Sequence, residues 1–375
     1  MANVSSSNGL EKRPKLRFPG FDEPWKICKA ESLFRNITEK NHPDDTVLTI
    51  VQGKGTLPRE KSGRNIHYDD ASLSNYKRVE KGDYIIHLRS FEGGLEMTHE
   101  TGIVSPAYTI LRCSKPHSSL FYEAYFHTDE FINHVLSKAV EGIRDGRQIS
   151  YEAFKWLGIP YCSNAEQEKI SALFDALNRR IEKQEQIVNA LKKYKRGLLS
   201  VSFADTASWR KKKLGDMCCI RTGKLDANAM VEGGKYPFFT CARERYTIDS
   251  FAFDTDALLI SGNGANVGYI HHYTGKFNAY QRTYVLDQFS ENINYVHVFL
   301  DRFLSSRIDA EKKAGNTPYI VLSTLSDMEI FLPDETMMKN LVEMFAQIDK
   351  HIENSNQILE CFISIRKGLL QQLFI

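Results

Sequence analysis

Residues 170–199 read ISALFDALNRRIEKQEQIVNALKKYKRGLL, and residues 341–370 read LVEMFAQIDKHIENSNQILECFISIRKGLL. The two stretches align without a gap at an offset of 171 residues, and the alignment extends over residues 149–204 and 320–375. Eleven aligned positions hold the same residue in both copies. Self-similarity at a fixed offset indicates an internal duplication, so the chain is expected to contain two related halves.

Apolar residues recur in both copies at alternating spacings of four and three, which is the heptad pattern of a coiled coil. The two polar interruptions fall at the same places in each copy, Gln184 and Ser355, and Lys195 and Arg366. We therefore expect two long helices that pair with each other as an antiparallel coiled coil. The apolar seam residues are Ile170, Phe174, Leu177, Ile181, Val188, Leu191 and Leu198 in the first copy, and Leu341, Phe345, Ile348, Ile352, Leu359, Phe362 and Leu369 in the second.

Two modules that differ in sequence accompany the helices. Each opens with a tryptophan and basic residues, at Trp25 and at Trp209, and then shows short strands that end in glycine turns. The fold class is therefore α+β, with a pseudo-two-fold internal repeat. The expected segments are a disordered polar tail at 1–13, a first module at 14–163, a helix at 164–204, a second module at 205–333 and a second helix at 334–375.

Within the modules, the pattern predicts strands at 83–88 and 256–261 and helices at 121–136 and 296–308. The repeat also suggests a strand at 319–322, where β-branched and aromatic residues adjoin.

The composition is that of an ordinary globular protein. Lys plus Arg number 49 and Asp plus Glu number 47 in 375 residues, so the net charge is only +2. A basic face for nucleic acid is compatible with this balance if acidic residues lie elsewhere. Seven cysteines without a C-x-x-C spacing, a polar N-terminus and no long apolar run predict a cytoplasmic protein with reduced thiols, no metal site and no membrane contact.

Sequence motifs for catalysis are missing. The chain has no phosphate-binding loop of the form G-x-x-x-x-G-K-[ST], no G-x-S-x-G and no H-E-x-x-H. Residues 316–319 read NTPY, which is close to the NPPY element of adenine methyltransferases but differs at Thr317, and no glycine-rich cofactor loop accompanies it. We therefore predict no catalytic residue.

Basic, amide and aromatic residues interleave in the predicted loops of both modules. Lys and Arg bind phosphates or the O6/N7 edge of guanine, and Gln binds adenine, so these loops are candidates for DNA contact. The candidate DNA-binding residues are Lys54, Arg59, Lys61, Arg64 and Arg89 in the first module, and Arg221, Lys224, Arg243, Arg245, Gln281 and Arg282 in the second.

Four sequence stretches make the chain resemble the specificity subunits of type I restriction–modification systems. They are the helix ends KRGLL (195–199) and RKGLLQQLF (366–374), the stretch I-P-x5-E-Q-x-K-I (159–170) and the opening PKLRFPGF (14–21). The second copy departs from the pattern, because Met337 and Met338 replace the Glu-Gln pair.

The resemblance implies two target recognition domains, each reading one half of a bipartite sequence in double-stranded DNA. It also implies that the helices set the spacer and dock two methyltransferase subunits, with restriction subunits as a further partner. S-adenosylmethionine, ATP and Mg would be bound by those partners. Two other hypotheses stay open at this stage: a coiled-coil scaffold with two protein-binding modules, and a self-contained DNA methyltransferase or nuclease.

Overall fold

The computed structural model of the chain describes residues 2–3, 14–62, 70–142, 147–311 and 319–374. The chain divides into two compact units. Unit 1 comprises Met1–Glu185 together with Gln357–Ile375, and unit 2 comprises Gln186–Asn356. The predicted tail at 1–13 lies outside the described residues, apart from Ala2–Asn3, which forms strand β1.

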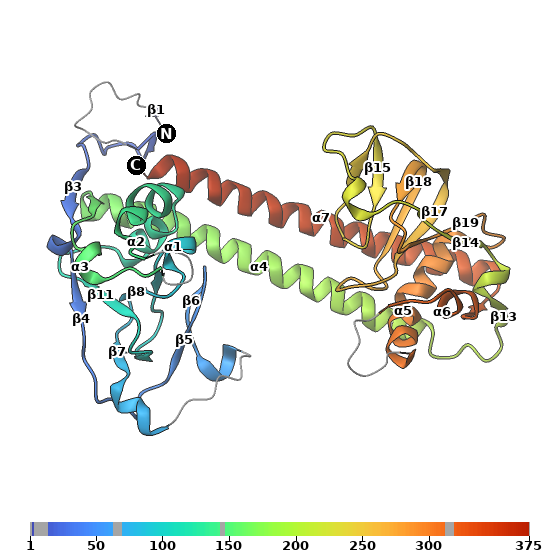
Figure 1. The fold of residues 1–375 in the computed structure, drawn as a ribbon, viewed down its shortest axis with the longest axis horizontal. Helices are drawn as coiled ribbons and strands as arrows, with labels where there is room; N and C mark the ends of the chain where they lie inside the picture. Colours follow the sequence, from blue (N-terminus) through green and yellow to red (C-terminus); the bar gives the residue numbers. More distant parts are fainter. Residues whose placement is uncertain (1, 4–13, 63–69, 143–146, 312–318, 375) are drawn as a thin grey trace. The chain divides into compact units, whose positions relative to one another are not determined.

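Two helices of 39 residues each, α4 (Asn164–Ser202) and α7 (Glu335–Leu373), are shared between the units (Figure 1). The helices predicted at 164–204 and 334–375 are therefore confirmed to within two residues. The boundary between the two units falls near the middle of each helix, whereas the sequence predicted each helix as a separate segment.

The two helices pair within each unit. In unit 1, the ring of Phe174 stacks on that of Phe374 with centroids 6.0 Å apart, and the Arg180 guanidinium lies 5.4 Å from the centre of the Phe362 ring. In unit 2, Lys195 Nζ lies 2.7 Å from a carboxylate oxygen of Asp349. Residue numbers fall along α7 as they rise along α4, so the pairing is antiparallel. Every residue of the predicted seam is buried or half-buried.

A small antiparallel sheet is repeated beside the helices. Strand β3 (Lys26–Lys29) pairs with β12 (Gly158–Tyr161) in unit 1, and β13 (Arg210–Lys213) pairs with β20 (Glu329–Leu332) in unit 2. Strands β12 and β20 are related by the same offset of 171 residues as the two long helices. The duplication found in the sequence therefore extends into the strands that adjoin the helices.

A short helix precedes this last strand in both copies, α3 (Tyr151–Phe154) in unit 1 and α6 (Leu322–Ser326) in unit 2. The strand predicted at 319–322 is therefore wrong. Tyr319 makes a single bridge to Asn263, and Thr324 Oγ1 accepts a hydrogen bond from the Val321 N–H at 3.3 Å, which caps the first turn of α6. A hydroxyl that satisfies an N–H group at a helix start outweighs the strand propensity of the preceding residues.

The two copies differ at the start of the long helices. Glu166, in the first turn of α4, accepts two hydrogen bonds from the Arg17 guanidinium at 2.8 and 2.7 Å and one from Trp25 Nε1 at 3.0 Å. All three side chains are buried. The aligned residue in α7 is Met337, which is partly exposed, so the second copy replaces an ionic anchor by an apolar side chain.

Unit 1 is completed by short sheets around an aromatic core. A four-stranded antiparallel sheet has the order β4 (Phe34–Ile37), β11 (Thr109–Cys113), β8 (Tyr84–Ile86) and β9 (Glu96–Met97). Strands β5 (Leu48–Val51) and β6 (Gly55–Pro58) form a hairpin, and β7 (Lys77–Val79) pairs with β10 (Gly102–Val104). The predicted helix at 121–136 corresponds to α2 (Ser119–Phe126) followed by a π-helical turn at Glu130–Val135.

Unit 2 contains a six-stranded sheet with helix α5 (Ile293–Glu311) packed in the same core. The strand order is β14 (Cys219–Thr222), β19 (Thr283–Asp287), β17 (Phe253–Ser261), β18 (Ile270–Ala279), β15 (Tyr236–Phe239) and β16 (Tyr246–Ile248). Among these six described strands, β15 and β18 pair in parallel and the other neighbours are antiparallel. The predicted strand at 256–261 is the buried end of β17, and the predicted helix at 296–308 lies within α5. In the described part of the chain, no helix is long and apolar enough to cross a lipid bilayer.

Candidate nucleic-acid interface

In unit 1, Lys54 lies at the turn of the β5–β6 hairpin. Its neighbours Gly53 and Gly55 both have φ of 75°, in the left-handed region that favours glycine. The Lys54 N–H donates to the Val51 carbonyl at 2.9 Å, which closes the turn. The side chain of Lys54 is exposed, so the hairpin presents one cation at its tip.

Other candidates of unit 1 lie near this hairpin. Lys61 is exposed in the 3-10 turn that follows β6, and Arg59 at the start of that turn is half-buried. Arg89 is exposed and directly precedes helix α1 (Ser90–Gly93). A Cβ atom placed on Gly93 would lie 1.7 Å from Gln52 Nε2, so α1 touches the hairpin next to its tip. The structure thus brings Lys54 and Arg89 onto neighbouring loops, whereas Arg64 lies outside the described residues.

A buried carboxylate lies beneath the hairpin tip. Glu96 in β9 accepts hydrogen bonds from the N–H groups of Gly53 at 2.6 Å and Gly55 at 2.9 Å, and His127 Nε2 lies 3.3 Å from its Oε1. Burial acts against the charged form of Glu96, yet His127 and the two backbone donors lower the pKa of Glu96. Burial likewise opposes the charged form of His127, but the bond to Glu96 outweighs it and raises the pKa of His127. The pair is therefore ionic.

In unit 2, Lys224, Gln281 and Arg282 come together. Gln281 and Arg282 occupy the tight turn between β18 and β19, and the Gln281 N–H donates to the Leu225 carbonyl at 2.9 Å. All three candidate side chains are exposed. Beside them lies a cavity of about 250 Å³, lined by Thr222, Gly262, Gln281, Arg282, Tyr284, Tyr319 and Ile320. The turn thus offers an amide and a guanidinium beside a concave polar surface.

Arg243 and Arg245 lie on the loop between β15 and β16. Arg243 Nε donates to Asn266 Oδ1 at 3.3 Å, and the guanidinium lies 5.3 Å from the centre of the Tyr269 ring. Arg245 lies 5.9 Å from the Tyr273 ring. Both arginines are exposed and are held above aromatic faces, which orders them without neutralising their charge.

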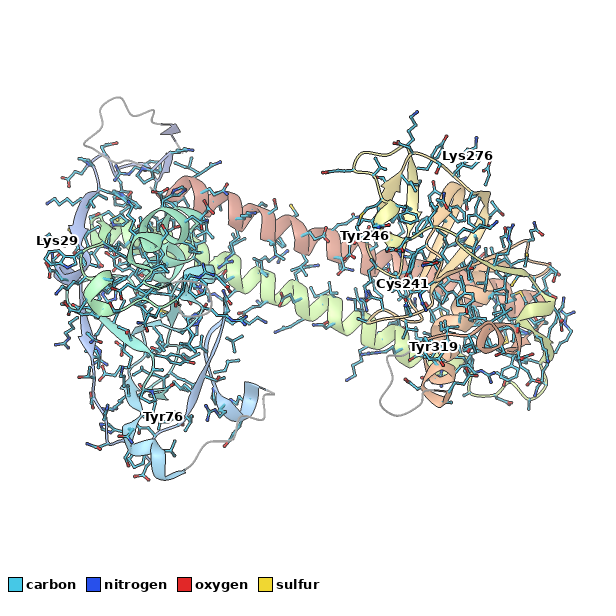
Figure 2. All side chains as sticks on the ribbon, viewed as in Figure 1. Lys29, Tyr76, Cys241, Tyr246, Lys276 and Tyr319 are labelled. Atoms are coloured by element: carbon cyan, nitrogen blue, oxygen red, sulfur yellow. The ribbon has the colours of Figure 1, made fainter. Side chains whose placement is uncertain are left out.

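Two hydrogen bonds link this loop to its neighbours. Asn266 Nδ2 donates to the Cys241 carbonyl at 3.1 Å, and Cys241 Sγ donates to the Arg282 carbonyl at 3.4 Å. Figure 2 labels Cys241 and Tyr319, which both lie in unit 2. The loops that carry Arg243, Gln281 and Arg282 therefore form one continuous surface of unit 2.

Arg221 differs from the other candidates. Its guanidinium bonds to the buried carboxylate of Asp287 and lies 5.3 Å from the Phe253 ring. It faces its own sheet, so the structure gives it a partner within the fold.

The sequence analysis did not single out Tyr319 and Asn266 as DNA-binding candidates. Tyr319 is 56% exposed and lines the cavity, and Asn266 connects two loops. In the sequence, Tyr319 belongs to the NTPY stretch and to the strand predicted at 319–322. For Asn266 a signal was available in principle, because it lies in the glycine-rich stretch 262–268, but the convergence of Asn266 and Tyr319 depends on strands that are distant in sequence.

Comparison with known proteins shows which proteins the chain resembles. Residues 207–361 match the family model described as the type I restriction modification DNA specificity domain. The EcoDI specificity subunit of Escherichia coli is 37% identical over 163 residues, which are 44% of this chain and 36% of that protein. The MjaIX specificity subunit of Methanocaldococcus jannaschii is 23% identical over 278 residues, 63% of this chain and 64% of that protein.

The chain thus matches less than two thirds of the length of both curated relatives. A crystal structure of the type I restriction-modification S subunit from M. genitalium has a TM-score of 0.63 at 17% identity, covering 97% of this chain and 99% of that one. This likeness is one of fold. Together the comparisons confirm the expected resemblance to type I specificity subunits and the α+β fold with two modules and long helices.

Proposed function

We propose that this chain is the DNA-specificity subunit of a type I restriction–modification complex, and that each unit reads one half of a bipartite target in double-stranded DNA. The observation that carries the proposal is the repeated frame of helix and small sheet, which supports two different sets of exposed basic loops. One of the two sets lies within the region that matches the DNA specificity domain. Because the loops differ, the two half-sites should differ in sequence.

The chemistry of binding follows from the side chains. Exposed cations such as Lys54, Lys61 and Lys224 would neutralise phosphates and make the affinity salt-dependent. Gln281 and Arg282 would read base edges, since an amide pairs with adenine and a guanidinium with guanine.

The helices would set the spacer and hold two methyltransferase subunits. Ile187 on α4 and Ile358 on α7 are aligned in the repeat and are 48% and 45% exposed. Tyr194 and Ile365, seven residues further along, are also aligned and exposed. Two equivalent apolar stripes suit two copies of one partner, because each copy could make the same contacts.

Catalysis would belong to the partners. The methyltransferase subunits would carry S-adenosylmethionine, and restriction subunits, where the system has them, would use ATP and Mg. The present chain would be non-catalytic and would act with these partners in the cytoplasm.

The test is co-expression with the methyltransferase subunit of a type I restriction–modification system from the same genome, followed by single-molecule sequencing of methyladenine in host DNA. The proposal expects one split motif with two different half-sites and a fixed spacer. Substituting Gln281 and Arg282 by Ala should relax one half-site and leave the other unchanged. A continuous motif, or methylation that does not require this chain, would contradict the proposal.

A further inference from the structure

The buried carboxylate of Glu96 accepts hydrogen bonds from the residues on both sides of Lys54. The Glu96 side chain is 1% exposed, and each of its carboxylate oxygens accepts a hydrogen bond from a different residue next to Lys54. Oε1 receives the Gly53 N–H at 2.6 Å, and Oε2 receives the Gly55 N–H at 2.9 Å. The turn that carries the exposed cation is thus fixed from below at two points.

His127 and the hairpin backbone both lie close to this carboxylate. The Nδ1–H of His127 donates to the Glu123 carbonyl at 2.7 Å, which directs its Nε2 toward Glu96 at 3.3 Å. A Cβ atom on Gly55 would lie 2.5 Å from the His99 ring and 2.6 Å from the Met97 carbonyl. The hairpin backbone therefore lies directly against β9, where only glycine fits.

A carboxylate beneath a phosphate-binding lysine is unfavourable by charge alone, since it repels DNA. The position of the Glu96 carboxylate is explained if it orders the Gly53–Gly55 turn. A tip that is already fixed loses little conformational freedom when it binds, so more of the contact energy appears as affinity. The His127 imidazolium offsets the negative charge and reduces the repulsion.

We propose that Glu96 is a positioning residue for DNA binding by unit 1: its carboxylate fixes the Gly53–Gly55 turn so that the Lys54 ammonium meets a phosphate of the first half-site. This inference rests on the proposed function. Glu96 itself does not touch DNA in this proposal.

The experiment measures the affinity of the complex with its methyltransferase subunits for a duplex that carries the methylated motif, at several salt concentrations. The variants are Glu96→Gln, Lys54→Ala and the double variant. Gln keeps the shape of Glu but can accept from only one of the two glycines. Asp83→Asn is the matched control, because Asp83 is also a buried carboxylate of unit 1, bonded to Arg112 at 2.7 Å and not to the turn.

Lys54→Ala should weaken binding roughly three- to tenfold and lower the slope of log affinity against log salt by about one. Glu96→Gln should do the same although it removes no cation, and the double variant should be no weaker than Lys54→Ala. Asp83→Asn should leave the slope unchanged. Simple electrostatics makes the opposite prediction for Glu96→Gln, because removing a negative charge should tighten DNA binding.

Unchanged or tighter DNA binding by Glu96→Gln overturns the inference. So does a double variant whose fold-loss in affinity is the product of the losses of the two single variants. Failure of the wild-type complex to bind the duplex would instead overturn the proposed function, and the inference with it. If Glu96→Gln does not fold, Gly53→Pro tests the same inference at an exposed turn. Proline removes the N–H group that donates to Glu96 and forbids the positive φ at this position. Glu96 then still has its contacts with Gly55 and His127. It should weaken binding as Lys54→Ala does, and wild-type affinity would overturn the inference.

Discussion

The buried ion pair between Glu166 and Arg17 at the start of α4 is expected to contribute strongly to the stability of unit 1. Glu166→Ala would leave the Arg17 guanidinium buried without its counter-charge and would remove the acceptor of Trp25 Nε1. We expect a loss of about 3–5 kcal/mol in the free energy of unfolding, because an uncompensated buried charge is costly. Urea unfolding followed by tryptophan fluorescence measures it.

The aligned residue of the second copy supplies the control. Met337→Ala removes a partly exposed side chain with no ionic partner, so the loss should stay below about 1 kcal/mol. Equal losses at the two positions would mean that the ionic anchor adds nothing beyond packing.

The ionic pair of Glu96 and His127 predicts a pH dependence of stability. The pKa of His127 is raised above its ordinary value of 6.5, so its contribution is complete below about pH 6.5 and is lost as pH rises through the raised pKa. The pKa of Glu96 is lowered from 4.5, so its contribution is present above about pH 4.5 and is lost as pH falls. The stability difference between wild type and His127→Gln should therefore be largest between these limits and shrink in alkali.

His271 in unit 2 provides a control of opposite sign. Burial lowers the pKa of His271, so the folded state loses stability as pH falls below 6.5, because the unfolded chain takes up the proton more readily. The difference between wild type and His271→Gln should change in acid and stay flat in alkali. A His127 difference that is constant from pH 5 to pH 9 would refute the ionic pair.

At the scale of the helix, adjacent residues have different tasks. Val188 lies in the seam and is 4% exposed, whereas Ile187 beside it faces outward. Val188→Ala should cost about 2 kcal/mol through lost burial and a cavity, and Ile187→Ala less than about 0.5 kcal/mol. Thermal or urea unfolding of the two variants distinguishes the faces of α4.

The reverse order is expected for partner binding. Ile187→Ala combined with Ile358→Ala should reduce the amount of methyltransferase subunit that co-purifies with the chain, whereas Val188→Ala should not if the protein stays folded. Undiminished co-purification with the double variant would place the docking surface elsewhere.

The helices were predictable because their pattern is local and long. A seam that repeats over four heptads in two copies leaves little ambiguity, and its bounds are confirmed to within two residues. The short segment at 319–322 was not predictable in the same way. Four residues carry no periodicity, and the hydroxyl of Thr324 decides the outcome by capping a helix.

At the scale of the whole molecule, the duplication revealed two modules but not the surfaces they form. Lys224, Arg243 and Gln281 share one surface because the six-stranded sheet places their loops together, including a parallel pairing of β15 with β18. Such strand pairings bring together residues that are far apart in sequence, so no local sequence pattern predicts them. The same applies to Arg221, whose partner Asp287 lies 66 residues away.

The low net charge of +2 is consistent with the ion pairs that neutralise many of the basic residues. The basic run of β13 is neutralised within unit 2, where Arg210 and Lys212 pair with Glu291 and Lys213 pairs with Asp327. The conspicuous basic sequence is therefore largely structural, and the exposed cations of the loops are the better candidates for DNA. Residue type alone could not separate the two groups.

The last prediction concerns the length of the paired helices. If the helices set the spacer, adding one heptad to both at the same level should lengthen it while preserving the seam. Lys195 pairs with Asp349, so an insertion after Lys192 in α4 is matched by one after Ile352 in α7. Seven helical residues add about 10 Å, and one base pair rises about 3.4 Å, so the spacer should grow by about three base pairs.

Sequencing of methyladenine in DNA modified by this double insertion gives the answer directly. Both half-sites should stay the same, because neither unit's loops have changed, and only the unspecified stretch between them should lengthen. An insertion in α4 alone leaves its partner helix short and should impair modification instead of shifting the spacer. A spacer of unchanged length in the double insertion would show that the helices hold partners without measuring distance, and that the spacing is fixed by the subunits docked on them.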